Sequence, residues 1–176
     1  MSGEVQRGVR LGVDVGQARV GLAASDPDGI LATPVRTLKR DPKKGSCRRL
    51  IVREALERDA VVVYVGLPVN LQGRSTASTQ DAEQYAQDLA AELGAAGSPA
   101  RVNLVDERLS TVSAHRQLRE AGRDTRSHRA VVDQVAAVQI LEQALNMQQS
   151  LQRDAGRPVA LPAPDGEDGT RGRSDS

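Results

Sequence analysis

The sequence predicts an α/β fold in which a mixed sheet carries helices on both faces. Two observations support this prediction. The first third of the chain holds three β-forming runs joined by short turns, a pattern typical of an antiparallel meander. Farther on, β-forming runs alternate with segments of helical periodicity, which is typical of β/α units with parallel strands. The expected element order is βββ-α-β-α-β-α-α, which gives a five-stranded sheet.

Three strands are expected in the meander. Gly16 permits a tight turn between the first two, and the run Asp26-Pro27-Asp28-Gly29 is a strong turn signal before the third. Pro34 cannot donate a backbone hydrogen bond, so the third strand is expected at a sheet edge or with an irregular middle. The expected strands are residues 9–14, 19–25 and 30–38.

The rest of the chain alternates helices and strands. Residues 60–65 are almost all β-formers, which is typical of a strand buried on both faces. A loop is expected at 66–73, where Gly66-Leu67-Pro68 would border any site at that strand end, and Ser75, Thr76 and Ser78 offer N-caps for a following helix. The expected helices are residues 43–58, 75–93, 110–120 and 127–148, and the further strands are 60–65 and 102–105.

With 176 residues, the chain is expected to form one folded domain. We divide it into a polar lead, residues 1–7, a domain, residues 8–148, and a tail, residues 149–176. The tail mixes Pro, Gly and charges with few large apolar residues, so disorder is expected there.

The composition favours a soluble, cytoplasmic protein with no membrane partner. Hydrophobic residues make up 39% of the chain, but no apolar run approaches the length of a membrane span, and no signal-peptide pattern is present. The single Cys47 excludes an internal disulfide, which fits a reducing compartment, and leaves a bridge between two chains open. We interpret Cys47 as an incidental thiol.

The net charge of +1 gives no overall basic signature, but basic residues gather in two segments. Residues 36–58 contain nine Lys or Arg against three acids, and residues 101–129 contain seven Arg against four acids. Both segments fit a surface that faces a polyanion and fit a solvated helix face equally well. The chain has two Tyr and neither Phe nor Trp, so stacking on single-stranded bases is not expected. Contacts with a nucleic acid would then rest on phosphates and shape.

Acidic residues stand at positions where a fold has little reason to place them. Asp14 ends the first strand, and Asp106-Glu107 ends the last one. Asp133 lies in the final helix, on the same side as Ala137 and Ile140, so it is expected on a buried stripe, where the small Ala136 and Ala137 would let the helix approach the sheet closely. A turn cap at Asp14 and an ion pair between Asp133 and an arginine are the structural alternatives.

If these acids converge, their mutual repulsion demands protons or a cation. Two carboxylates about 4 Å apart repel each other by roughly 4 kcal/mol at an effective dielectric near 20. No Cys or His pattern indicates zinc, and carboxylate ligands select hard ions such as Mg²⁺ or Mn²⁺. A pair of such ions can activate water and stabilise the leaving oxygen of a phosphodiester. The residues therefore predict a metal-dependent phosphodiesterase.

Other polar residues fit more than one role. Arg19 and Arg108 lie beside the acids and can either contact phosphate or neutralise carboxylates. His115 and His128 are interpreted as solvent-facing helix residues, and Ser110 as a helix cap, because no Ser-His-Asp arrangement is evident.

Four blocks of the sequence resemble the YqgF family, also called RuvX, whose members have an RNase H-like fold and are related to RuvC resolvases. The resemblance covers roughly residues 8–146, and the four blocks follow the order and spacing of the family. The blocks are Asp14-Val15-Gly16 with Arg19-Val20-Gly21 and Ser25-Asp26; Val65-Gly66-Leu67-Pro68 with Asn70 and Gly73; Asp106-Glu107-Arg108-Leu109-Ser110-Thr111; and Val132-Asp133 with Ala136-Ala137 and Ile140-Leu141.

The resemblance implies catalytic, metal-binding acids at Asp14, Glu107 and Asp133, with Asp106 as an alternative ligand beside Glu107. The cofactor expected at these acids, from their carboxylate chemistry, is Mg²⁺ or Mn²⁺, as two ions. Family members often carry a lysine shortly before the final acid, where this chain has Ala130, Val131 and Val132. The expected phosphate contacts are therefore Arg19, Arg108, Arg126 and Arg129.

The family resemblance implies a nuclease that matures the 5′ end of pre-16S rRNA, with pre-rRNA or a ribosomal precursor particle as partner. The kinship with RuvC leaves open a Holliday-junction resolvase, which would act on branched DNA as a homodimer because a junction needs paired cuts. Two further alternatives are a non-catalytic RNA-binding module for ribosome assembly and a nucleotide-binding phosphotransferase, although the latter usually needs a second domain.

Overall fold

The computed structural model of the chain describes residues 5–41, 45–68, 74–107 and 126–159, the last range without the side chains of residues 126–133. The helix expected over 110–120 lies outside these residues. Within the described part of the chain, no helix is both long and apolar enough to cross a membrane.

A single mixed sheet forms the centre of the fold, in the strand order β3-β2-β1-β4-β5-β6. The first three strands pair antiparallel, β1, β4 and β5 run parallel, and β6 closes the edge antiparallel to β5. The strands are β1 (Arg10–Val15), β2 (Arg19–Ser25), β3 (Ala32–Lys39), β4 (Val62–Leu67), β5 (Arg101–Asp106) and β6 (Arg157–Pro158). The predicted fold class is confirmed, with a sheet of six strands rather than five.

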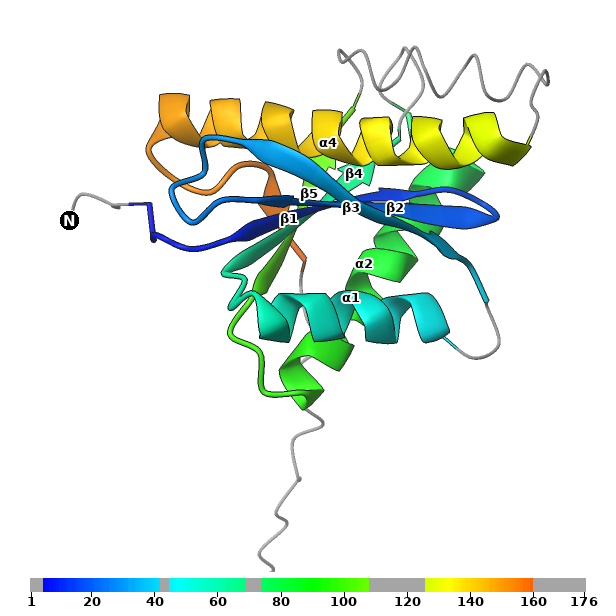
Figure 1. The fold of residues 1–176 in the computed structure, drawn as a ribbon. Coiled ribbons are helices and arrows are strands. Elements are labelled where there is room, and N and C mark those ends of the chain that lie inside the picture. The colour runs from blue at the N-terminus through cyan, green and yellow to red at the C-terminus, as the bar shows by residue number, and fades with distance from the viewer. Residues whose placement is uncertain (1–4, 42–44, 69–73, 108–125, 160–176) are drawn as a thin grey trace, which may run out of the picture.

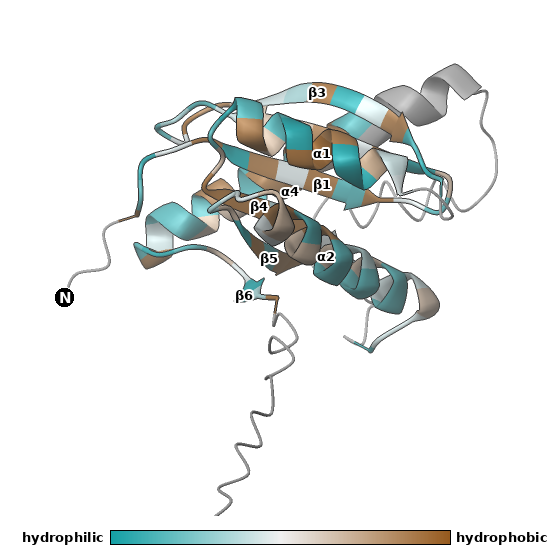
Figure 2. Ribbon diagram, turned by 90° about the horizontal axis from the view of Figure 1, so that it is seen from below, coloured by the Kyte–Doolittle hydropathy of each residue, from teal (hydrophilic) through white to brown (hydrophobic). Residues whose placement is uncertain are grey.

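Helices cover both faces of this sheet. One long helix, α4 (Arg126–Leu151), crosses the upper face in Figure 1, and α1 (Ser46–Glu57) and α2 (Ala77–Ala95) lie on the opposite face. Figure 2 shows α1 and α2 in front of the sheet when it is viewed from below. The apolar side chains separate accordingly into one core beneath α1 and α2 and another beneath α4.

Local sequence signals account for the boundaries of several elements. Thr76 caps α2 through a reciprocal pair of hydrogen bonds with Thr79. The pairing of β2 with β3 slips between Leu22 and Ala23, and Ala23 lies opposite Pro34. This confirms the irregular middle that was predicted for the third strand.

The helix α4 lies unusually close to β1, and Gly12 makes this possible. A Cβ atom at Gly12 would stand 2.7 Å from the Ala137 carbonyl oxygen and 2.7 Å from the Leu141 Cβ. Ala136 and Ala137 are buried at this contact. The close approach that was predicted from these two alanines is confirmed.

The segment after α4 belongs to the fold, which corrects the expected start of the tail at residue 149. Helix α4 continues to Leu151, and β6 then pairs with β5. Ala155 is buried: its N–H donates to the Tyr64 hydroxyl at 3.2 Å, and its carbonyl accepts from the Asn103 amide at 2.9 Å. Low hydrophobicity was a poor guide here, because buried polar contacts rather than large apolar side chains hold this segment.

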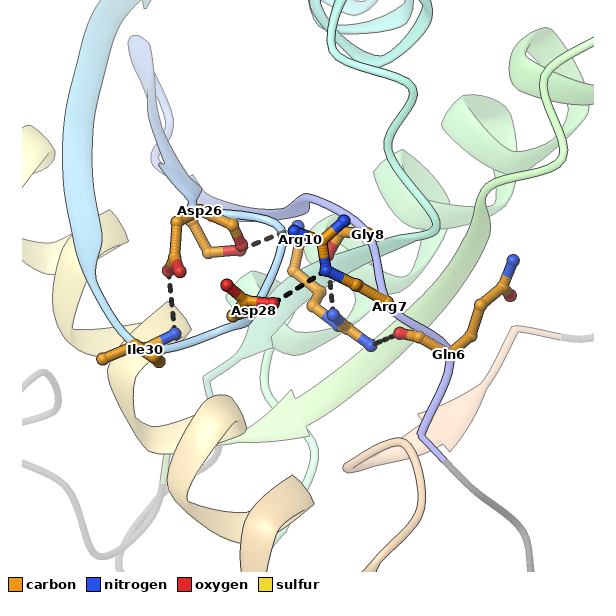
Figure 3. A network of polar contacts seen from close by, with 8 residues as sticks. Gln6, Arg7, Gly8, Arg10, Asp26, Asp28 and Ile30 are labelled. Carbon is orange, nitrogen blue, oxygen red and sulfur yellow. Dashed lines mark hydrogen bonds and ion pairs between the residues drawn. The ribbon is translucent and has the colours of Figure 1, made fainter.

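A buried arginine ties the N-terminal lead to the sheet (Figure 3). Arg10 is 1% exposed, and its guanidinium donates to the carbonyl oxygens of Gly8, at 2.6 Å, and of Gln6. Burial lowers the pKa of Arg10. Nearby, the Asp26 carboxylate accepts hydrogen bonds from the backbone N–H groups of Leu31 and Ile30, each at 2.8 Å, and these bonds lower its pKa. The network closes the end of the sheet where β1 begins.

We expect Tyr64→Phe to lower the free energy of unfolding by about 1–3 kcal/mol. The Tyr64 hydroxyl donates to Gln148 Oε1 at 3.0 Å and accepts from Ala155, so its loss leaves two buried polar groups without their partner. Urea unfolding measures the change. The control is Arg53→Ala, which removes only an exposed ion pair with Glu57 and should cost about 0.3–0.5 kcal/mol. Equal effects of the two substitutions would contradict the role assigned to the hydroxyl.

Candidate active site

Two predicted acids, Asp14 and Glu107, are buried on the same face of the sheet, with exposures of 0% and 1%. Side chains alternate between the two faces along a strand. Gly12 faces α4, so Asp14, two residues farther along β1, faces α4 as well. The Glu107 carboxylate lies on this face too, because it borders the α4 side of Gly66, where Ile140 of α4 also approaches.

The parallel strands bring both acids to one edge of the sheet. Val13 of β1 pairs with Val65 of β4, so Asp14 and Gly66 are the next residues on these strands. Glu107 follows β5, and its backbone N–H donates to the Leu67 carbonyl at 3.2 Å. The strand order β1-β4-β5 then places Gly66 on the strand between the two acids.

Asp106 and Glu107 have different environments. Glu107 is buried on the α4 face, whereas Asp106 is exposed. Because side chains alternate between faces along β5, Asp106 points to the same face as Val102 and Leu104, which belong to the core beneath α1 and α2. The structure therefore places Glu107, and not Asp106, on the same face as Asp14.

Helix α4 carries the third predicted acid, Asp133, toward the same edge. Ala137 lies over Gly12, and Asp133 precedes Ala137 by one helical turn. Leu145, farther along α4, lies next to Gly29 at the opposite end of the sheet. The N-terminal part of α4, which contains Asp133, therefore lies toward the Asp14 end. The side chain of Asp133 is outside the described residues. Among the side chains that the structure describes, no three acids, histidines or cysteines form a group that could hold a metal.

The predicted phosphate contacts are placed only in part. Arg19 is the first residue of β2, which follows β1 after a short turn. Gly21 pairs with Asp14, and Arg19 lies two residues before Gly21, so its side chain is on the same α4 face. Arg108 and the side chains of Arg126 and Arg129 lie outside the described residues, as do His115, Ser110 and the side chain of His128.

Ion pairs neutralise much of the basic segment 36–58. Arg40 binds both carboxylate oxygens of Asp81, at 2.5 and 2.7 Å, and this hydrogen bonding raises the pKa of Arg40. The other pairs are Arg36–Glu54, Arg48–Glu92, Arg53–Glu57 and Arg58–Glu54. Five arginines of this segment thus contact carboxylates of the same chain, which favours the structural interpretation of this run over a polyanion surface.

The fold is shared with RuvC. The structure of T. thermophilus RuvC in complex with a Holliday junction substrate matches with a TM-score of 0.52, covering 86% of this chain and 99% of RuvC at 14% identity. A second structure of RuvC from Thermus thermophilus matches with a TM-score of 0.50. The fold is therefore the RNase H-like fold of the RuvC type.

Sequence relatives identify the family. The family model described as RuvX, Holliday junction resolvase, matches residues 8–147. A protein of Clavibacter michiganensis is 52% identical over 157 residues, covering 89% of this chain and 92% of the relative. A protein of Mycobacterium ulcerans is 52% identical over 145 residues, covering 82% of each chain. Both bear the name "Putative pre-16S rRNA nuclease". The chain belongs to the RuvX family.

We expect Cys47 to react slowly with a disulfide reagent such as DTNB in the folded protein. The sulfur is buried and lies at 3.2 Å from the Tyr85 hydroxyl, which donates a hydrogen bond to it, so the reagent cannot reach the thiol. Absorbance at the thionitrobenzoate band, followed with and without denaturant, measures the difference. Cys47→Ser provides the blank, and fast reaction of the folded protein would contradict this burial.

Proposed function

We propose that this protein is a metal-dependent nuclease that hydrolyses phosphodiester bonds in the maturation of the 5′ end of pre-16S rRNA. One observation carries the proposal: Asp14 and Glu107 are buried on the same sheet face, at the edge toward which α4 leads Asp133. Burying carboxylates together is costly unless a cation or protons compensate their charge.

The donor set fits a hard divalent cation. Carboxylate oxygens are the ligands that Mg²⁺ and Mn²⁺ prefer. Gly66, on the strand between the two acids, has no side chain. The Glu107 carboxylate therefore lies directly against the α4 face of this strand. Asp14, Glu107 and Asp133 would hold two Mg²⁺ or Mn²⁺ ions. The chemistry such ions supply when bound is water activation and stabilisation of the leaving oxygen.

The residues of the chain have two further roles in this proposal. Ile140 of α4 packs against the site at Gly66 and keeps bulk water from this side, which strengthens the attraction between carboxylates and cations. Arg19 would contact a phosphate that flanks the scissile bond, and Arg108, Arg126 and Arg129 would contact others. These contacts read charge and shape, as expected for a protein with so few aromatic residues.

The choice of RNA as substrate rests on the relatives, which are named as pre-16S rRNA nucleases. The chain matches these relatives over most of their length. Pre-rRNA, alone or within a ribosomal precursor particle, is therefore the proposed partner, and the cytoplasm the proposed location. The family description and the RuvC fold favour a second candidate, a resolvase of Holliday junctions that acts as a homodimer.

We expect purified protein to cleave labelled pre-16S leader RNA with Mn²⁺ or Mg²⁺ and not with EDTA. Asp14→Asn and Glu107→Gln should each lower the rate by roughly 100-fold or more, because loss of even an outer-shell partner costs about 10–100-fold. Asp106→Asn is the matched control and should retain activity, since Asp106 is exposed and faces away from α4. Gel electrophoresis of the products compares the wild type with the three variants.

A synthetic four-way junction is the parallel substrate. Paired cuts in the junction by a dimer, without cleavage of RNA, would replace the proposed substrate with branched DNA. Cleavage that survives both Asp14→Asn and Glu107→Gln would contradict the carboxylate site. Absence of cleavage together with absence of Mn²⁺ binding would favour a non-catalytic module.

A further inference from the structure

We propose that Gly66 is a positioning residue of the candidate active site: the absence of a side chain at Gly66 lets the Glu107 carboxylate lie against β4 on the side of Asp14. This inference rests on the proposed function. It concerns a residue that touches neither substrate nor cation and acts through Glu107.

The first observation is the contact itself. An added Cβ atom at Gly66 would stand 2.1 Å from Glu107 Oε1 and 3.1 Å from Glu107 Cδ. Real Cβ atoms essentially never approach a neighbour below 3.0 Å. Any side chain at position 66 therefore has to displace this carboxylate.

The second observation excludes the usual reason for a glycine. Gly66 is an interior residue of β4, where glycine weakens a strand. Its φ is outside the left-handed range, in contrast to Gly29, at +68°, and Gly156, at +71°. The backbone at Gly66 thus accepts any L-residue, and what requires glycine is the close approach of a neighbouring group.

The third observation is the place of Gly66 in the sheet. It lies on β4, between β1 with Asp14 and β5 with Glu107. Glu107 comes one residue after β5, so its carboxylate reaches the site by extending over β4. A methyl group at position 66 would occupy the surface across which Glu107 reaches toward Asp14.

A structural role for Gly66 can be separated from this one. The added Cβ would also stand 2.5 Å from Cδ1 of Ile140, a core residue of α4. Both clashing atoms are the ends of flexible side chains, so the fold can adapt while the carboxylate moves. The substitution Ile140→Val removes Cδ1, and Gly66→Ala combined with Ile140→Val leaves Glu107 as the group that must yield.

Binding of Mn²⁺ alone, measured by isothermal titration calorimetry, tests the proposal without a nucleic-acid substrate. We expect Gly66→Ala, by itself and with Ile140→Val, to weaken Mn²⁺ binding about 10- to 100-fold, with a matching fall in RNA cleavage. Gly94→Ala is the matched control, because an added Cβ there meets nothing within 4 Å, and it should bind Mn²⁺ as the wild type does. Circular dichroism verifies that each variant is folded.

Shortening the acid supplies a test that a merely structural role would not pass. Glu107→Asp should weaken Mn²⁺ binding in the wild-type background, because the carboxylate no longer reaches across β4. In the Gly66→Ala background the same change should restore part of the lost affinity, because the shorter side chain avoids the new methyl group.

The outcomes separate the two proposals. Wild-type protein that binds no Mn²⁺ overturns the proposed function, and this inference with it. Wild-type protein that binds Mn²⁺ while Gly66→Ala binds it equally well overturns the inference alone. A double variant, Gly66→Ala with Ile140→Val, that does not fold would assign Gly66 to core packing and would also overturn it.

Discussion

The contact between α4 and β1 is the constraint on which the rest of the structure depends. Helix α4 can approach the sheet this closely only because Gly12 has no side chain: the Ala137 carbonyl oxygen lies 2.7 Å from the position that a Cβ would take. This contact fixes the height of the helix over the sheet and, with it, the path along which α4 carries Asp133 toward the strand ends. The candidate site therefore has its geometry set by backbone proximity, which is stiffer than a contact between flexible side chains.

Burial explains why the same edge of the sheet suits a cation. Asp14 and Glu107 are enclosed between the sheet and a helix whose inward face is apolar, where uncompensated charge is expensive. Elsewhere in the described part of the chain, several charged side chains form ion pairs nearer the surface. Arg40 with Asp81 and Arg48 with Glu92 are examples of such pairing, and both link the basic segment to α2.

Much of the fold follows from the local sequence. The β-branched run of β4, the turn signals of the meander and the apolar stripe of α4 identify the elements, because periodicity reports directly on which side of a segment is buried. The sequence also singled out Asp14, since a carboxylate at the end of an apolar strand needs a reason. It could not separate Asp106 from Glu107, because neighbouring residues after a strand differ only in the face to which they point, and the register that decides this is set by pairing with β4.

What the sequence by itself determined is the fold class and the order and type of the elements β1 to β5, α1, α2 and α4, because these depend on local patterns. The set of acids it proposed rests on local patterns as well. Only the tertiary structure decided the burial of Glu107 rather than Asp106, the contact of that carboxylate with Gly66, and the internal pairing of the basic segment. It also decided that Ala155 and β6 close the sheet edge beyond α4. These features join residues far apart in the chain, so no local pattern carries them.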